Sequence, residues 1–295
     1  MGHVVGAAGL KRAFLIAVYV VCAAHGGFIG DRRALLRSAA GGNCSQATAF
    51  LARTSGLSGT ETAAYKAMIC GMVADGTWSK LDVLYVFATN TQTTALLNLV
   101  STSYTGTVHG TVSFAADQGY TGDGSTFYID SPWQPATGPN FTQNGAAYGL
   151  YSLTSVAGAS SFAMGEDTAF FDIDLSLLTG GGLLNASICS TAATLSVANS
   201  STVGQYIVSR TSSSNTAVYK NGSATPFVNS TTDTSHALTA QDLYFFARND
   251  LPGPAGFWNG KLSAGWAGGA MTAAQAANVA SRVNAYMTAL GINVY

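Results

Sequence analysis

Residues 105–270 consist of short segments rich in β-branched and aromatic residues, separated by clusters of Gly, Pro, Asn, Asp or Ser. Short strands at this spacing indicate a β-sandwich or a barrel. Asn221 and Gly222 lie between two such segments and predict a tight hairpin, because both residues tolerate positive φ. The expected strands are residues 111–114, 127–129, 146–153, 169–175, 205–209, 217–220, 243–247 and 261–266.

Helices are expected on both sides of this β region. Ser58 and Glu61 have the spacing of a capping box, and apolar residues then recur at helical spacing to residue 73. Residues 83–88 are β-branched and aromatic and predict a buried strand. Thr272 and Gln275 form a second capping box, and Gly291 suits the end of that helix.

These patterns divide the chain into four parts. Residues 1–45 are an arm or leader, and residues 46–104 a helical preface with one strand. Residues 105–271 are the β-sandwich, and residues 272–295 a C-terminal helix that we expect to pack over a sheet face or rim.

The amino terminus allows two interpretations. Residues 13–24 are apolar, follow Lys11 and Arg12, and are short for a membrane span of about 20 residues, which fits a secretory signal peptide. Residues 9–15 also resemble residues 30–36, and a repeated basic-apolar arm that docks onto a partner could use both copies. A membrane is a partner only if residues 13–24 act as a signal or an anchor.

Charge is scarce. Asp, Glu, Lys and Arg make up 9% of the residues, against roughly 25% in an ordinary soluble domain, so the surface must be neutral and polar. Such compositions recur in secreted β proteins and in viral coat and fibre proteins. The net charge is −1, and basic residues cluster only at 11–12 and 32–37. Nucleic-acid binding, which requires clustered Lys and Arg, is therefore not expected.

The four cysteines contain no C-x-x-C pair, which argues against a zinc site. Cys70 and Cys189 lie in apolar runs and are expected to be buried small apolar side chains. A disulfide between Cys44 and Cys70 is an alternative that the sequence leaves open.

Several segments resemble the laminin-G-like, concanavalin A-like jelly roll. Residues 119–130 resemble the segment that opens that fold, residues 217–222 its hairpin and residues 257–262 its late strand, and a helix closes the chain. The resemblance implies a mainly β fold, a two-sheet antiparallel jelly-roll sandwich with a helical N-terminal preface and a C-terminal helix. Together with the preface, at residues 52–57, 84–88 and 96–99, the arrangement also resembles virion or tail-associated proteins of tailed phages and prophages.

Many relatives of this jelly roll are glycosidases, whose laminarinase-like members use two Glu residues on one strand. This chain has only Glu61 and Glu166, 105 positions apart, and no Gly-x-Ser-x-Gly motif. His109 and His236 lie in loop-like stretches. No catalytic residues are therefore expected. Asp172 and Asp174 alternate along a strand and share one face, so Ca²⁺ binding there is an alternative to a solvated strand face. No other cofactor is expected.

Two tryptophans in stiff or polar loops are candidate ligand-binding residues. Trp133 lies between two prolines, and Trp258 follows the polar residues Arg248, Asn249 and Asp250. A rigid aromatic ring in a loop can stack on a sugar or anchor a protein partner. The competing interpretation, which we favour, is core packing under a loop.

The leading functional hypothesis is a non-catalytic component of a phage virion, in a decoration, fibre or tail-tip role. Its partners would be other virion subunits or further copies of itself, as a homo-oligomer such as a trimer, and a cell-surface glycan. The alternative is a secreted bacterial lectin that binds polysaccharide.

Overall fold

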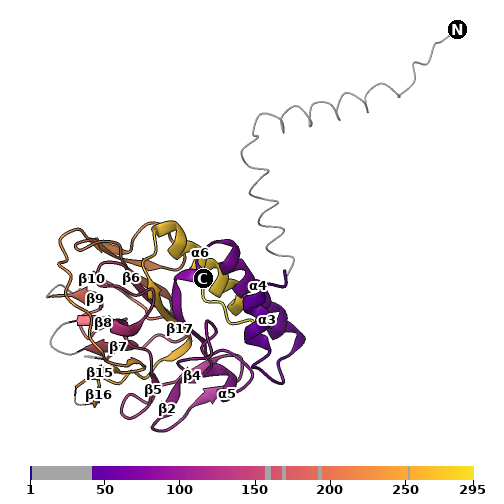
Figure 1. Ribbon diagram of the computed structural model, residues 1–295, viewed down its shortest axis with the longest axis horizontal. Coiled ribbons are helices and arrows are strands. Elements are labelled where there is room, and N and C mark those ends of the chain that lie inside the picture. The colour runs from indigo at the N-terminus through magenta and orange to yellow at the C-terminus, as the bar shows by residue number, and fades with distance from the viewer. Residues whose placement is uncertain (2–41, 157–160, 168–170, 192–194, 252) are drawn as a thin grey trace. The chain divides into compact units, whose positions relative to one another are not determined.

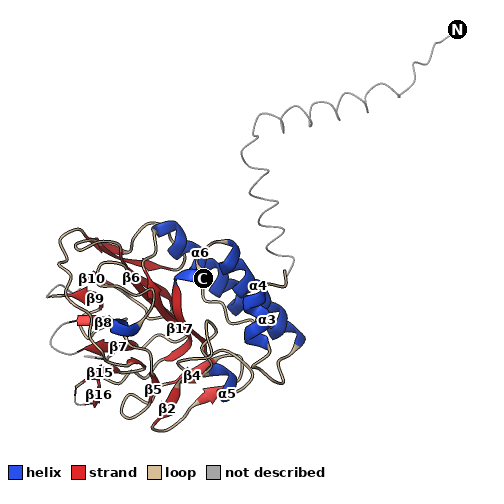
Figure 2. Cartoon of the chain, in the orientation of Figure 1, coloured by secondary structure: helices blue, strands red, loops and turns tan. Residues whose placement is uncertain are grey.

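The computed structural model describes residue 1 and residues 42–156, 161–167, 171–191, 195–251 and 253–295. Residues 43–295 form one compact unit of two β-sheets with helices along one side (Figure 1, Figure 2). The predicted arm or leader, up to residue 41, lies outside the described residues.

The mainly β, two-sheet antiparallel sandwich with flanking helices is confirmed. The first sheet, sheet A, has the order β13 (Val228–Ser230), β12 (Thr216–Lys220), β11 (Gly204–Arg210), β6 (Ala146–Ser152), β17 (Lys261–Gly269), β4 (Gly119–Thr121), β3 (Phe114–Ala115), with β1 (Leu81–Val86) also on β17. The second, sheet B, has the order β10 (Leu195–Ala198), β9 (Leu183–Ser190), β8 (Phe171–Ser176), β7 (Met164–Asp167), β14 (Leu243–Phe245), β5 (Tyr128–Ser131), β2 (Thr107–His109). Strand β15 (Arg248–Asp250) pairs in parallel with β7 and carries β16 (Gly253–Ala255).

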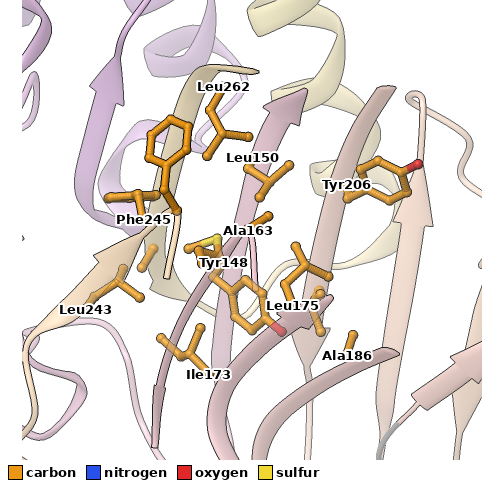
Figure 3. Close-up of a cluster of buried hydrophobic side chains, with 14 of the residues drawn as sticks. Tyr148, Leu150, Ala163, Ile173, Leu175, Ala186, Tyr206, Leu243, Phe245 and Leu262 are labelled. Carbon is orange, nitrogen blue, oxygen red and sulfur yellow. The ribbon is translucent and has the colours of Figure 1, made fainter. Parts of the chain in front are cut away.

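Sheet A is buried on both faces. Along the chain from β1, Val83, Tyr85 and Phe87 enter the core between the sheets, whereas Leu84 and Val86 enter a second core under the helices. This explains why the segment is apolar without alternation. The core between the sheets includes Tyr148, Ile173, Phe245 and the other side chains labelled in Figure 3.

The helices follow the expected pattern. They are α3 (Ser45–Leu51), α4 (Gly59–Ala74), α5 (Gln92–Ala95) and α6 (Ala273–Ala289), with 3₁₀ turns η1 (Trp78–Lys80) and η2 (Pro135–Thr137). Both predicted capping boxes are present, at the starts of α4 and α6. The two long helices pack against each other and cover the outer face of sheet A, as Figure 2 shows.

Two expectations need correction. Residues 111–113 form no strand, because Gly110 turns the chain with φ of +77° so close to Thr126 that a Cβ would lie 2.4 Å from its carbonyl oxygen. Cys70 is not a free apolar side chain but is disulfide-bonded to Cys44, which ties the start of α3 to α4. Cys189 is buried, as expected. The turn at Asn221 and Gly222 is confirmed, with φ of 53° and 71°, but the hairpin is not a tight one, because β12 ends at Lys220 and β13 begins only at Val228.

A fully buried ion pair lies at the end of β11 and links sheet A to β9 of sheet B. The Arg210 guanidinium lies 2.7 Å from the Asp233 carboxylate and also donates to the Ile188 and Ser212 carbonyls and the Ser190 hydroxyl. These four hydrogen-bonded partners compensate the cost of removing both charges from water. No described helix is long and apolar enough to cross a membrane.

The disulfide is expected to contribute substantially to stability, because it closes a loop of 26 positions and so restricts the unfolded chain. Replacing both Cys44 and Cys70 by Ser should lower the free energy of unfolding by about 3 kcal/mol. Urea unfolding of both proteins measures this. In the presence of a reductant the two curves should converge, and a difference that persists under reduction would contradict the assignment.

Candidate functional site

The structure places both candidate tryptophans in the core. Trp133 is fully buried and packs edge-on against Phe141, with ring centroids 5.4 Å apart. Trp258 is 1% exposed and its ring lies against Gly260. A Cβ added at Gly260 would be 2.1 Å from the Trp258 ring. Neither indole offers a face to a ligand. This corrects the idea of two aromatic platforms in loops, and the prolines around Trp133 position it for packing.

Arg248 is the centre of a charged cluster. Its guanidinium lies 3.1 Å from the carboxylate of Asp167, 3.2 Å from Asp174 and 2.6 Å from Asp250, and it covers the ring of Phe162 at 4.4 Å. Gly165 makes room for it, because a Cβ there would lie 3.0 Å from the Arg248 Cγ. The three strands β7, β8 and β15 each supply one carboxylate to this single cation.

The cluster is mostly removed from water. Burial raises the pKa of Asp174 to about 8, even though the Arg248 charge opposes the shift. Asp174 is 5% exposed, so the expectation of a solvated strand face is wrong for this residue. The side chain of Asp172 lies outside the described residues. Among the side chains that the structure does describe, no group of three or more His, Cys, Asp or Glu could hold a metal ion.

Among the other polar candidates, Asn249 and Glu166 are opposite each other in the pairing of β15 with β7, and both are buried. Asn249 is 6% exposed and donates to the Asp242 carbonyl, so it supports the end of β14 and does not face solvent. Glu166 is fully buried and accepts a hydrogen bond from Thr239. Successive residues of a strand point to opposite faces, so Glu166 and Asp167 do not share a site. His236 is buried, whereas His109 ends strand β2 and is partly exposed.

An aromatic cluster on the outer face of sheet B was not predicted. Phe127, Ile129, Leu243 and Phe245 point into the core, so the alternating residues Tyr128 and Tyr244 point outward. The Tyr128 ring stacks on His109, with centroids 4.5 Å apart and planes 7° from parallel, and lies 4.6 Å from the Tyr244 ring. Three neighbouring strands thus bring His109, Tyr128 and Tyr244 together. We call these three partly exposed residues the aromatic platform.

Two carboxylates lie beside the aromatic platform. Asp130 is directly opposite Tyr244 in the pairing of β5 with β14, and Asp242 precedes Tyr244 by two residues. Burial, followed by the charge of Asp242, raises the pKa of Asp130 to about 6. Gln134 donates to one oxygen of Asp242 at 2.8 Å, whereas the buried Oδ1 of Asp130 has no hydrogen-bond partner.

The sequence carried a signal for this face. In residues 127–130 and 243–245, apolar core residues alternate with Tyr and Asp, which is the pattern of strands with one partly exposed face. What it could not indicate was which strands are neighbours. His109 is 19 positions from Tyr128, and Tyr128 is 116 positions from Tyr244.

Comparison with known proteins supports the architecture. No protein-family model and no curated protein matches the chain. A mutant of Trypanosoma rangeli sialidase displaying trans-sialidase activity is similar, with a TM-score of 0.50 at 9% identity over 75% of this chain and 39% of that one. Domain 4 of AbnA, an extracellular GH43 arabinanase from Geobacillus stearothermophilus in complex with arabinotriose, has a TM-score of 0.48 at 16% identity over 68% of this chain and 98% of that domain. At 9% identity the likeness to the sialidase shows the fold alone.

Removing the central cation should destabilise the protein in a pH-dependent way. Arg248→Met leaves three carboxylates without a cation, so the free energy of unfolding should fall by about 2 kcal/mol, less than for a fully buried pair because the cluster is partly exposed. The loss should be larger at pH 8 than at pH 5. The raised pKa of Asp174 means that its carboxyl favours the folded state when protonated and opposes folding as the pH rises toward 8.

Arg282→Met is the matched control, because Arg282 pairs with Asp75 at 2.8 Å near the surface. Its loss should be below about 1 kcal/mol. Chemical unfolding at both pH values measures all three proteins. Equal losses in the two variants, or an Arg248→Met deficit independent of pH, would contradict the role of Arg248.

Proposed function

We propose that residues 43–295 are a non-catalytic glycan-binding domain that holds a sugar chain on the aromatic platform. The observation that carries the proposal is the stacking of His109, Tyr128 and Tyr244, three rings held partly exposed by adjacent strands. A rigid aromatic surface binds with little loss of side-chain entropy. Sugars present apolar ring faces that stack on such a surface.

The polar groups around the platform suit hydroxyl ligands. Asp130 and Asp242 are hydrogen-bond acceptors, and the hydroxyls of Tyr128 and Tyr244 can each donate or accept a hydrogen bond. A binding face of this kind, with apolar rings and a few convergent polar groups, is typical of small-molecule sites. The likeness to the sialidase supports the fold and not the ligand, so the proposal depends on this face.

Absence of catalysis is part of the proposal. Hydrolysis by two carboxyl groups requires a pair about 5–10 Å apart on either side of the scissile bond. The two Glu residues do not supply such a pair, since Glu61 caps α4 and Glu166 is buried in sheet B. Turnover of any glycan that is lost in Asp130→Asn, Asp242→Asn or Glu166→Gln would contradict a purely binding role, because Asp130 and Asp242 are the carboxyl pair beside the aromatic platform.

Binding should depend on the two tyrosine rings. Tyr128→Ala and Tyr244→Ala should each weaken binding of an oligosaccharide found on a glycan array by about ten-fold, or ~1.4 kcal/mol, as expected for a central aromatic contact. Tyr128→Phe should retain most of the affinity if stacking dominates. Calorimetric titration measures the affinities.

Tyr295→Ala is the matched control, because Tyr295 is 38% exposed and packs near Tyr151 of sheet A. It should bind as the unaltered protein does. Failure to bind any glycan, or equal weakening by all three Ala variants, would remove the proposal.

A role in a virion is the second candidate, favoured by the scarcity of charge. With 9% charged residues, subunit surfaces repel one another weakly and can pack closely. We propose a homo-oligomer, with a trimer as the isolated form, in which residues 1–42 contribute the attachment.

Light scattering should give a higher mass per particle for the full chain than for a chain beginning at Asn43, which keeps the disulfide. A full chain that is monomeric across micromolar concentrations would leave the secreted glycan-binding protein as the better hypothesis.

A further inference from the structure

The face that carries the aromatic platform is strongly asymmetric in charge. One described cation, Arg248, lies among five carboxyl groups. Four are on strands β5, β7, β8 and β15, and the fifth is on the residue before β14: Asp130, Asp167, Asp174, Asp250 and Asp242. Strand β7 connects the two groups, since Gly165 is paired with both Tyr244 and Arg248. A ligand on the platform therefore lies in a negative field.

The two terminal nitrogens of Arg248 are both engaged by protein carboxylates. One of its terminal nitrogens contacts Asp167 and Asp174, and the other contacts Asp250 at 2.6 Å. The Phe162 ring covers one face of the guanidinium. An arginine that recognises a carboxylate does so through two free, parallel N–H groups, and here both terminal nitrogens are already paired with protein carboxylates.

Resting on the proposed function, we propose that this face discriminates by charge, admitting uncharged sugars and rejecting sugars that carry a carboxylate, with Asp130 and Asp242 as the specificity-determining residues. Asp130 and Asp242 are partly exposed, so their carboxylates can accept hydroxyl hydrogens from a neutral sugar. A uronate instead presents a carboxylate, which is a negatively charged acceptor like the Asp side chains. The carboxylates repel each other and cannot form a hydrogen bond with each other.

The discrimination should weaken in acid. The groups that face Asp130 are Asp242 and Tyr244 from the β14 side and Tyr128 from its own strand, with Thr107 opposite it on β2. Because burial and Asp242 raise the pKa of Asp130 to about 6, its carboxyl is ionised at pH 7.5 and largely protonated at pH 5. A uronic acid, with a pKa near that of an α-carboxyl at roughly 3.5, stays charged at both pH values.

The test uses matched probes. Hexasaccharides of glucose, mannose and galactose are each compared with the same chain oxidised at C6 to the uronate, by calorimetry at pH 7.5 in low salt. We expect at least one neutral chain to bind and its uronate to bind about ten-fold more weakly, from two like charges at close range. The difference in affinity between the neutral chain and its uronate should narrow at pH 5. It should also narrow in 0.5 M NaCl, because salt screens partly exposed charges.

Variants assign the effect to the two carboxylates. Asp130→Asn and Asp242→Asn should each reduce the ratio of neutral-chain affinity to uronate affinity several-fold, and thermal unfolding of each variant shows that it folds. Asp75→Asn, at the end of α4, is the control and should leave this ratio unchanged. Uronates that bind as tightly as neutral chains, or a ratio that Asp130→Asn leaves unchanged, would overturn the charge filter while leaving the glycan-binding proposal intact. Binding of no probe at all would instead overturn both.

Discussion

The burial of sheet A on both faces is the constraint on which the rest of this structure depends. Alternate residues of β1 enter two different cores, one between the sheets and one under α4 and α6. At the centre of the sheet, the ring of Trp266 occupies the space beside Gly149. A Cβ added at Gly149 would lie only 2.5 Å from that ring. An apolar sheet face of this size would be unstable in water, so the helices are required for the sandwich and are not an accessory to it.

This arrangement determines where a ligand can bind. The outer face of sheet A is occupied by helices, whereas the outer face of sheet B presents His109, Tyr128 and Tyr244, which remain partly exposed. Sheets hold side chains more precisely than loops do, because both neighbours and register are specified by backbone hydrogen bonds. The proposed glycan face therefore lies on the most rigid available surface, and the aromatic residues in loops contribute to the core instead.

The few charges of this chain are used mainly inside it. Arg210 is fully buried with Asp233, and Arg248 neutralises carboxylates from three strands. Each of these two arrangements joins segments that are distant in the sequence. A surface formed largely from hydroxyl and amide groups is the consequence, and it agrees with the neutral composition.

By itself, the sequence determined the local structure. The capping boxes at Ser58 and Thr272, the hairpin at Asn221 and the apolar run at residues 83–88 were predicted correctly, because each depends on neighbours within a few positions. The spacing of its strands also indicated a sandwich or a barrel, and the resemblance to the jelly roll favoured the sandwich.

Only the tertiary structure decided what those elements place together. Whether Trp133 and Trp258 are exposed depends on which loops fold over them, and both proved to be buried. Whether Cys70 is an apolar side chain or half of a disulfide depends on the approach of α3 to α4. The aromatic platform depends on the pairing of β2, β5 and β14. The register of these strands brings His109 next to Tyr128, 19 positions away, and Tyr128 next to Tyr244, 116 positions away. The physical reason is that strand order is set by long-range burial of the whole core, which no local pattern encodes.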